Sequence, residues 1–185
     1  AQALISNFRV SSERASDLIS TGSQRGLNYS GELLDNISEY SVQFAKLGLS
    51  AEDMFTIFDN GVQAGAFNLD KIGDAVKEFS IRAIDGSNTT IEGFTKLGLN
   101  ADEMAQKFAN GGDTAKEAFY QVITQIANMD DKVQQSIVGV DLFGTMWEDL
   151  GPEVVTQLGS IRDGYNEVAG SADKLSQIKY NDLGS

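Results

Sequence analysis

Residues 47–65 read LGLSAEDMFTIFDNGVQAG, and the first half of this stretch returns at residues 97–111 as LGLNADEMAQKFANG. A looser copy, FRVSSERASDLISTGSQRG, occupies residues 8–26. Three copies of one pattern within 185 residues indicate a repeated helical unit rather than a chain arranged around one reactive site.

Each copy carries its own signals for the start and the end of a short helix. In the middle copy Ser50 is followed three residues later by Asp53, which approximates a capping box: the serine hydroxyl accepts a backbone N–H of the first turn. Asn60-Gly61 is predicted to end the helix, because glycine adopts the left-handed conformation at little cost. The corresponding start and stop signals in the other copies are Asn100 with Asn110-Gly111, and Ser11 with Gly22.

The spacing between copies defines the repeated unit. Ser11 and Ser50 lie 39 residues apart, as do Gly22 and Gly61, whereas the middle and third copies are offset by 50 residues. We therefore expect each unit to be a short helix, a glycine-marked turn and a longer helix. The expected units span about residues 8–46, 47–96 and 97–129, followed by C-terminal helices over 130–185.

The pattern along the rest of the chain predicts an all-α fold of about nine short helices, packed as one compact domain. No stretch shows the sustained alternation of a strand, and the chain contains a single proline. The clearest helix is expected over residues 69–84, with one apolar face. Further caps are expected at Thr89, Thr114, Asp130-Asp131 and Thr145, and the helix after Asp131 is expected to turn Val133, Ile137, Val140 and Phe143 inward.

Length and termini bear on domain organisation. A chain of 185 residues and 19.9 kDa fits one domain. Its opening, AQALISNFRV, reads like the interior or end of a helix, so we expect residues 1–185 to be a single helical domain cut from a longer protein. No run of about 18 apolar residues is present, so we expect no membrane span in this part.

Composition limits the chemistry. The chain has no cysteine and no histidine, which removes disulfides, thiolate zinc sites and Ser-His-Asp triads. Its net charge of −13 disfavours direct nucleic-acid binding, which needs clustered Lys and Arg. We predict no catalytic, cofactor-binding or metal-binding residue, and no enzymatic activity. Two weak candidates have simpler explanations as helix caps and first-turn acids: the calcium-loop-like residues 68–73, and the carboxylate pairs Glu52/Asp53, Asp102/Glu103 and Glu148/Asp149.

One neighbourhood is a candidate for contact with a partner. Phe143, Met146 and Trp147 stand close together in the sequence, between Gly139 and Gly151. A tryptophan in such a setting either anchors the core or forms an exposed hot spot for a partner, and the sequence leaves both open.

Five stretches of the sequence form a recognisable series: GLNYSGELLDNISEY, residues 47–82, DGSNTT, LGLNADEMAQKFANGG and VGVDLFGTMWEDLG. Together they resemble the core region of phage tail tape measure proteins, of the minor-tail-protein kind found in siphophages and prophages of Gram-positive bacteria. The resemblance covers about residues 12–170 and depends on ordered elements in series rather than on one motif. The long coiled-coil and membrane-active segments typical of such proteins are absent from this stretch.

The resemblance implies a structural role in the virion. Tape measure proteins fill the tail tube, set tail length during assembly and leave ahead of the DNA. The implied partners are the tail tube protein, tail assembly chaperones and distal tail or baseplate proteins, with further copies of the chain as another possibility. The implied locations are the virion tail and, during assembly, the host cytoplasm.

Two other functions stay open at this stage. A helical-repeat module of another system would bind a protein partner through an exposed apolar groove, expected near Trp147. A peptidoglycan-cleaving domain would need two carboxylates in a deep cleft, one with a raised pKa. No residue pattern for such a domain is evident.

Overall fold

The computed structural model describes residues 1–160, 164 and 165 and confirms the all-α fold. Eleven helices and no strand occur in this part of the chain, and nine of the helices have seven residues or more. The helices are α1 (Gln2–Phe8), α2 (Ser12–Gln24), α3 (Leu33–Lys46), α4 (Ala51–Gln63), α5 (Leu69–Arg82), α6 (Asn88–Lys96), α7 (Ala101–Asn110), α8 (Gly112–Ala127), α9 (Lys132–Phe143), α10 (Met146–Leu150) and α11 (Pro152–Val155).

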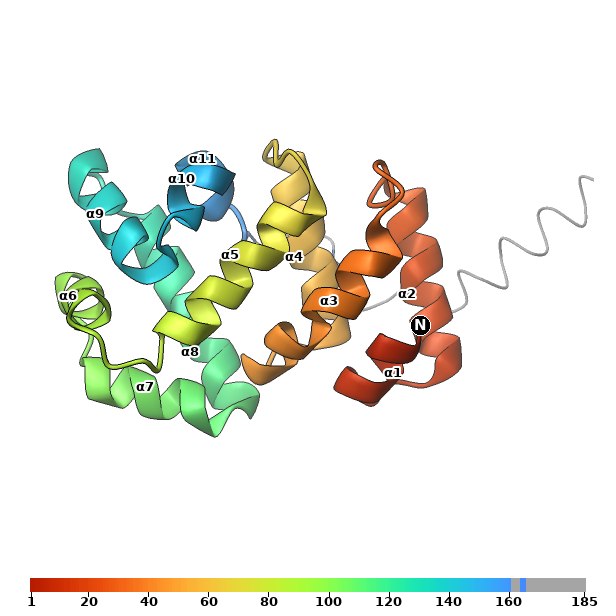
Figure 1. Ribbon diagram of the computed structural model, residues 1–185, viewed down its shortest axis with the longest axis horizontal. Helices are drawn as coiled ribbons and strands as arrows, with labels where there is room; N and C mark the ends of the chain where they lie inside the picture. Colours follow the sequence, from red (N-terminus) through yellow and green to blue (C-terminus); the bar gives the residue numbers. More distant parts are fainter. Residues whose placement is uncertain (161–163, 166–185) are drawn as a thin grey trace, which may run out of the picture.

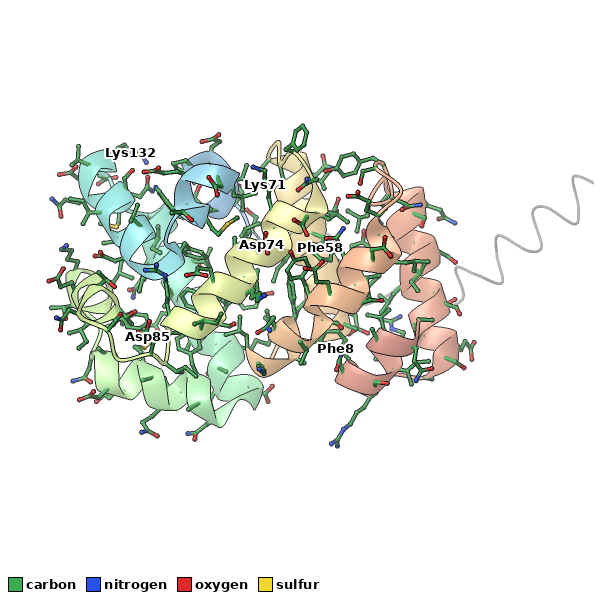
Figure 2. All side chains as sticks on the ribbon, viewed as in Figure 1. Phe8, Phe58, Lys71, Asp74, Asp85 and Lys132 are labelled. Atoms are coloured by element: carbon green, nitrogen blue, oxygen red, sulfur yellow. The ribbon has the colours of Figure 1, made fainter. Side chains whose placement is uncertain are left out.

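Helix α5 runs through the centre of an elongated arrangement, with α1–α4 towards one end and α6–α9 towards the other (Figure 1). It packs against α3 and α4 on one side and against α9 and α10 on the other. Its Phe79 ring contacts the rings of Phe108, Phe119 and Phe143, at centroid distances of 5.2–5.6 Å. On the other side of α5 lies Phe58 of α4, which Figure 2 labels. Its ring meets the ring of Phe44 of α3 edge-on, at a centroid distance of 5.4 Å. Helix α5 thus lies between a cluster of four aromatic rings and a pair of aromatic rings.

The LGL sequence that opens the middle and third copies is a helix corner. In the middle copy Gly48 has a φ of +73°, and the Leu49 N–H donates to the Phe44 carbonyl at 3.1 Å. The same geometry returns at Gly98, where Leu99 N–H donates to the Phe94 carbonyl at 2.9 Å. This pattern satisfies the last carbonyls of the helix and sets the position of the next cap. The caps expected after these corners, Ser50 and Asn100, are confirmed, each accepting the backbone N–H three residues later.

The first copy turns at the equivalent position, but with a different residue and a different hydrogen bond. Arg9 stands where Gly48 and Gly98 stand, and it has φ 57° and ψ 32°. Among the described residues it is the only non-glycine with a positive φ. Its N–H donates to the Ile5 carbonyl at 3.0 Å, and Ser11 then caps α2. The looser sequence copy therefore shares the left-handed residue and the following cap of the other two, in a conformation that an L-residue adopts at a cost.

The stops expected at Gly22 and Gly61 are wrong. Both glycines lie inside their helices, and α2 and α4 end near Gly26 and Gly65, where φ is +93° and +106°. A Cβ on Gly61 would lie 2.4 Å from Cδ1 of Ile72, so this glycine is needed for close packing rather than for a turn. The third stop, at Gly111, is confirmed, with a φ of +68°.

The remaining caps are only partly as expected. Asp131 accepts the backbone N–H groups of Val133 and Gln134, so the cap of α9 is confirmed. Ser87, rather than Thr89, caps α6, because its hydroxyl accepts the Thr90 N–H. Thr114 lies within the first turn of α8, which begins without a side-chain cap. Thr145 precedes α10 but makes no cap hydrogen bond.

The inward face is confirmed for α5 and wrong for α9. In α5 the expected residues Leu69, Ile72, Val76 and Phe79 are all buried. In α9 the inward residues include Val138, Gly139 and Leu142 together with the expected Phe143, whereas three residues expected inside point to solvent. These three are Val133, Ile137 and Val140.

Candidate partner-binding surfaces

The Trp147 neighbourhood lies inside the core. Trp147 is 1% exposed, Phe143 is fully buried and Met146 packs partly buried against the core. The indole lies on the backbone of α9, since a Cβ on Gly139 would be 2.2 Å from its Cδ2. The indole Nε1 has no hydrogen-bond partner among the described residues. This geometry favours the core-anchor interpretation, and partner contact by Phe143, Met146 and Trp147 stays a prediction that their burial disfavours.

The exposed apolar surface of this region lies on the opposite face of α9. Val133 is 69% exposed, Ile137 38% and Val140 39%, and their spacing of four and three residues places them along one side of the helix. With Lys132, Ser136 and Asp141 they line a shallow groove of 580 Å³. We call these six residues the α9 face. Sequence reasoning found its apolar members but placed them inside.

Charged groups close both ends of the α9 face. Lys132 stands at the outer end of the helix, where its ammonium donates to the Met129 carbonyl at 3.4 Å (Figure 2). At the other end Asp141 Oδ2 lies 3.6 Å from Lys96 Nζ of α6 and has no hydrogen-bond partner among the described residues. The face is therefore apolar in its centre, with Lys132 beside Asp131 at one end and the Asp141–Lys96 pair at the other.

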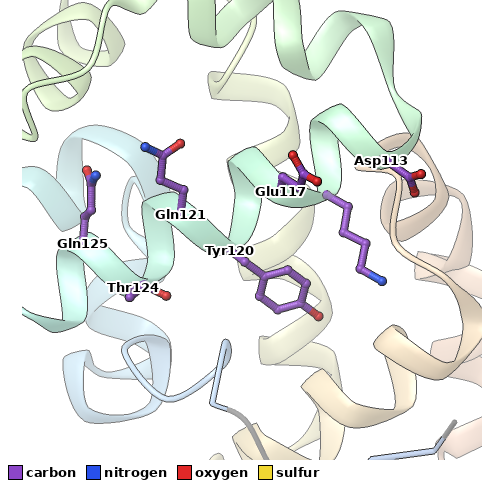
Figure 3. A pocket seen from close by; sticks show the side chains of 7 residues that line it. Asp113, Glu117, Tyr120, Gln121, Thr124 and Gln125 are labelled. Atoms are coloured by element: carbon purple, nitrogen blue, oxygen red, sulfur yellow. The ribbon is translucent and has the colours of Figure 1, made fainter.

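A second groove, of 710 Å³, follows α8 and is polar (Figure 3). Lys116 pairs with Asp53 of α4 at 2.9 Å, and the Tyr120 hydroxyl lies 3.4 Å from the same carboxylate. Burial, followed by the Asp53 charge, raises the pKa of Tyr120. Asp113 and Glu117 stand one turn apart on the same helix rather than opposite each other, which does not match the facing carboxylates of a glycosidase.

The end of the described chain returns to the first and second repeat units. The amide of Asn60 donates to the carbonyls of Leu158 and Ser160, each at 3.0 Å. Tyr165 is buried, its ring lies 5.4 Å from Phe55, and the Arg25 guanidinium lies 4.5 Å above it. Burial, together with the Asp59 charge, raises the pKa of Tyr165 to about 12. The segment is thus fastened to α2 and α4.

Sequence reasoning missed this attachment, although a signal was present. Arg14 donates to the Tyr165 carbonyl at 2.9 Å and pairs with Glu52 at 2.8 Å. In the middle copy the equivalent position holds Asp53, and the position equivalent to Arg25 holds Ala64. Charge differences between two otherwise matching copies therefore mark where the first copy contacts another part of the chain.

Two kinds of feature are absent from the part of the chain that the structure describes. None of its helices combines the length and apolar character that crossing a membrane requires. No three Asp or Glu side chains gather there in a way that could hold a metal ion.

Comparison with known proteins identifies the family. The family model for phage-related minor tail proteins matches residues 1–144. The probable tape measure protein of Streptomyces phage phiC31 is 32% identical over 149 residues, which cover 80% of this chain and 20% of that protein. The chain therefore spans about a fifth of the length of this relative. No solved structure matches significantly. The chain belongs to the family of phage-related minor tail proteins.

Proposed function

We propose that this chain is a structural part of a phage or prophage-derived tail, within a tape measure protein that sets tail length and takes part in tail assembly and genome ejection. The observation that carries this proposal is the 32% identity to a probable tape measure protein over 80% of the chain. The family match over residues 1–144 supports the same role.

The proposed partners and locations follow from that role. The tail tube protein, tail assembly chaperones and distal tail or baseplate proteins would contact the full-length protein in the virion tail, and in the host cytoplasm during assembly. The net charge of −13 suits a protein that shares a narrow compartment with DNA without binding it.

The proposed role is structural rather than enzymatic. The carboxylates in the larger groove stand on one face of α8, so no acid and base face each other across a substrate there. A helical-repeat module that binds another protein is the alternative, and the α9 face is the observation that favours it.

An in-frame deletion of the region encoding residues 1–165 from its parent gene tests the proposal. We expect phage particles with no tails or with tails of altered length in negative-stain electron microscopy, and we expect peptides of this chain in purified wild-type tails. The matched control is Phe67→Ser, because Phe67 is 80% exposed and lies outside the helices. Normal, infectious tails of unchanged length after the deletion would contradict the length-setting role, and absence of the chain from purified tails would favour the binding-module alternative.

A further inference from the structure

Helix α9 is apolar on two opposite sides. Val138 and Leu142 are fully buried, whereas Val133, Ile137 and Val140 line the exposed groove. Apolar side chains gathered on a surface and bordered by polar groups are typical of a contact site for another molecule. Helix α9 lies at the edge of the molecule, so a partner can approach this side (Figure 1).

The three apolar side chains of the α9 face form a straight row. Because they are spaced four and three residues apart on a helix, the row is about 10 Å long. One amphipathic helix fits such a row when its own apolar side chains have the same spacing. An extended peptide would need the edge of a sheet for its backbone hydrogen bonds, and the described residues contain no strand. The shape of the α9 face therefore favours a helix as its occupant.

The first end of the row is net negative. Asp130 and Asp131 are both exposed, and neither forms an ion pair with a described residue, whereas Lys132 supplies one positive charge. Oδ1 of Asp131 accepts the N–H groups of Val133 and Gln134, which holds this carboxylate beside the row. Its Oδ2 makes neither of these bonds and is open to the cation of a partner.

The other end of the row lies against α6. Gly93 of α6 packs on α9, since a Cβ there would lie 2.9 Å from the Cβ of Asp141. Asp141 is only 9% exposed and lies 3.6 Å from Lys96 Nζ, so the charges of this pair already balance. Glu92, next to Gly93 in the chain, is exposed and forms no ion pair with a described residue. An unbalanced negative charge thus stands at this end as well.

We propose that the α9 face binds a basic amphipathic helix of a partner protein. The apolar side of that helix covers Val133, Ile137 and Val140, and its lysine or arginine side chains reach Asp131 and Glu92. The acidic ends of the row and the net charge of −13 repel a phosphate backbone, an anionic lipid surface and a second copy of this chain. The inference goes beyond the proposed tail function and does not depend on it.

The complex is expected to be weak. Stable protein complexes bury about 1,200–2,000 Å², and one helix on this row buries less, so we expect a dissociation constant on the order of 100 µM.

Binding of synthetic peptides to the whole chain tests the chemistry of the partner. The probe is a fluorescent peptide of about 14 residues, with leucines at the spacing of the row and lysines on its other sides. One matched peptide has glutamate in place of lysine, and another has the same composition in scrambled order. We expect fluorescence anisotropy to show binding of the first peptide alone, and weaker binding as salt is added. Equal binding of either matched peptide, or no binding of the probe at millimolar protein, would overturn the proposal.

Two glutamine variants test whether the peptide binds on the apolar row. Ile137 and Ile81 are both exposed isoleucines on helices, and only Ile137 belongs to the α9 face. We expect Ile137→Gln to weaken peptide binding about tenfold, because it removes the central apolar contact, and Ile81→Gln to leave binding unchanged. Circular dichroism checks that both variants stay helical. Equal effects of the two changes would overturn the proposal, as would a dimer of the wild-type chain in sedimentation velocity that Ile137→Gln abolishes.

Two double variants test the charged ends of the row at the same net charge. Glu92→Gln with Asp131→Asn removes an acid from each end, and asparagine remains a good cap for α9. Asp113→Asn with Glu117→Gln removes two exposed acids from α8 instead. We expect the first double variant to bind the lysine peptide about fivefold more weakly, through the loss of two exposed ion pairs, and the second to bind it normally. Equal weakening in both would show that the overall charge, rather than this site, attracts the peptide, and would overturn the proposal.

Discussion

Two regions of the molecule, α1–α5 and α9–α10, are packed in the same way but differ in the side chains that face solvent. In each, an aromatic ring lies flat on a glycine in the middle of a helix: Tyr40 on Gly73 of α5, and Trp147 on Gly139 of α9. The Cβ that each glycine lacks would be 2.3 and 2.2 Å from the ring. Yet α5 has a polar outer side, with Asp70, Lys71 and Asp74 in its first half, whereas the outer side of α9 is apolar.

Polar side chains on one side of a helix fix which of its faces points into the core. The Tyr40 hydroxyl of α3 lies within hydrogen-bond distance of two carboxylates of α5, Asp70 Oδ1 (2.7 Å) and Asp74 Oδ1 (2.6 Å). Burial and, after it, these two carboxylates raise the pKa of Tyr40. Rotating α5 would break these contacts and bury charge. In α9 the inward polar contacts are those of Gln135, whose Nε2 donates to the Ile126 carbonyl at 2.9 Å, and of Asp141 with Lys96, so these contacts and the packing against the indole together choose the inner face.

The largest expected effect is the loss of that indole. We expect Trp147→Ala to lower the free energy of unfolding by about 3–5 kcal/mol, because it empties a fully packed site and removes the ring that orients α9. Chemical denaturation followed by circular dichroism measures it. Phe67→Ala, on a ring that is mostly in solvent, should change stability by less than about 0.5 kcal/mol. A small effect of Trp147→Ala would contradict its role in the core and favour its role as an exposed partner contact.

The next effect compares the two ring-covered glycines directly. We expect Gly139→Ala and Gly73→Ala each to cost about 1–2 kcal/mol, since overpacking costs more than the roughly 1 kcal/mol that alanine gains in a helix. Gly22→Ala, whose Cβ would be 2.9 Å from the Phe55 ring, should cost less. Thermal or denaturant unfolding of the three variants gives the order. Stabilisation by Gly139→Ala would show that the indole does not lie on α9.

A third comparison lies within α9 itself. Val138 is buried and Val140, two residues later, belongs to the α9 face. We expect Val138→Ala to cost about 2 kcal/mol, from two lost methyl groups and a small cavity, and Val140→Ala to cost less than about 0.5 kcal/mol in the monomer. Denaturant unfolding followed by circular dichroism gives both costs. Equal costs at the two positions would mean that both faces are covered in the single chain.

The smallest effect concerns the corners that precede α2, α4 and α7. Because Arg9 adopts the left-handed conformation that Gly48 and Gly98 adopt elsewhere, we expect Arg9→Gly to stabilise the chain by about 0.5–1 kcal/mol. The reverse change, Gly98→Ala, should destabilise by about 1 kcal/mol, since nothing lies near its missing Cβ and only the backbone is affected. Changes of opposite sign in the melting temperatures of the two variants support equivalent corners, and changes of the same sign would refute the equivalence.

Local sequence signals predicted many of the helix boundaries. The caps at Ser11, Ser50 and Asn100 and the limits of α3 could be read from the sequence because each depends on neighbours within a few residues. The helix ends at Gly26 and Gly65 could also have been read correctly. In both copies two glycines stand four residues apart, and the second one takes the left-handed position.

Other features depend on contacts that sequence spacing does not contain. Gly61 is inside α4 because Ile72 of α5 occupies the space of its missing side chain. The outer position of Ile137 follows from the placement of Trp147 on α9, which no period within α9 encodes. The family could be recognised because ordered elements recur in series, but neither the α9 face nor the attachment of Tyr165 to the first repeat follows from that recognition.

Labelling of single cysteines in the cysteine-free chain tests most directly whether α9 has one buried and one open apolar face. Cysteines at Val133, Ile137 and Val140 should react with a thiol reagent at nearly the rate of an unfolded peptide when the protein is dilute. Cysteines at Val138 and Leu142 should react more slowly by a factor on the order of 100 or greater, because a buried thiol reacts only after local unfolding of the helix. The reverse order, with Ile137 protected and Val138 reactive in the dilute chain, would contradict the orientation of α9.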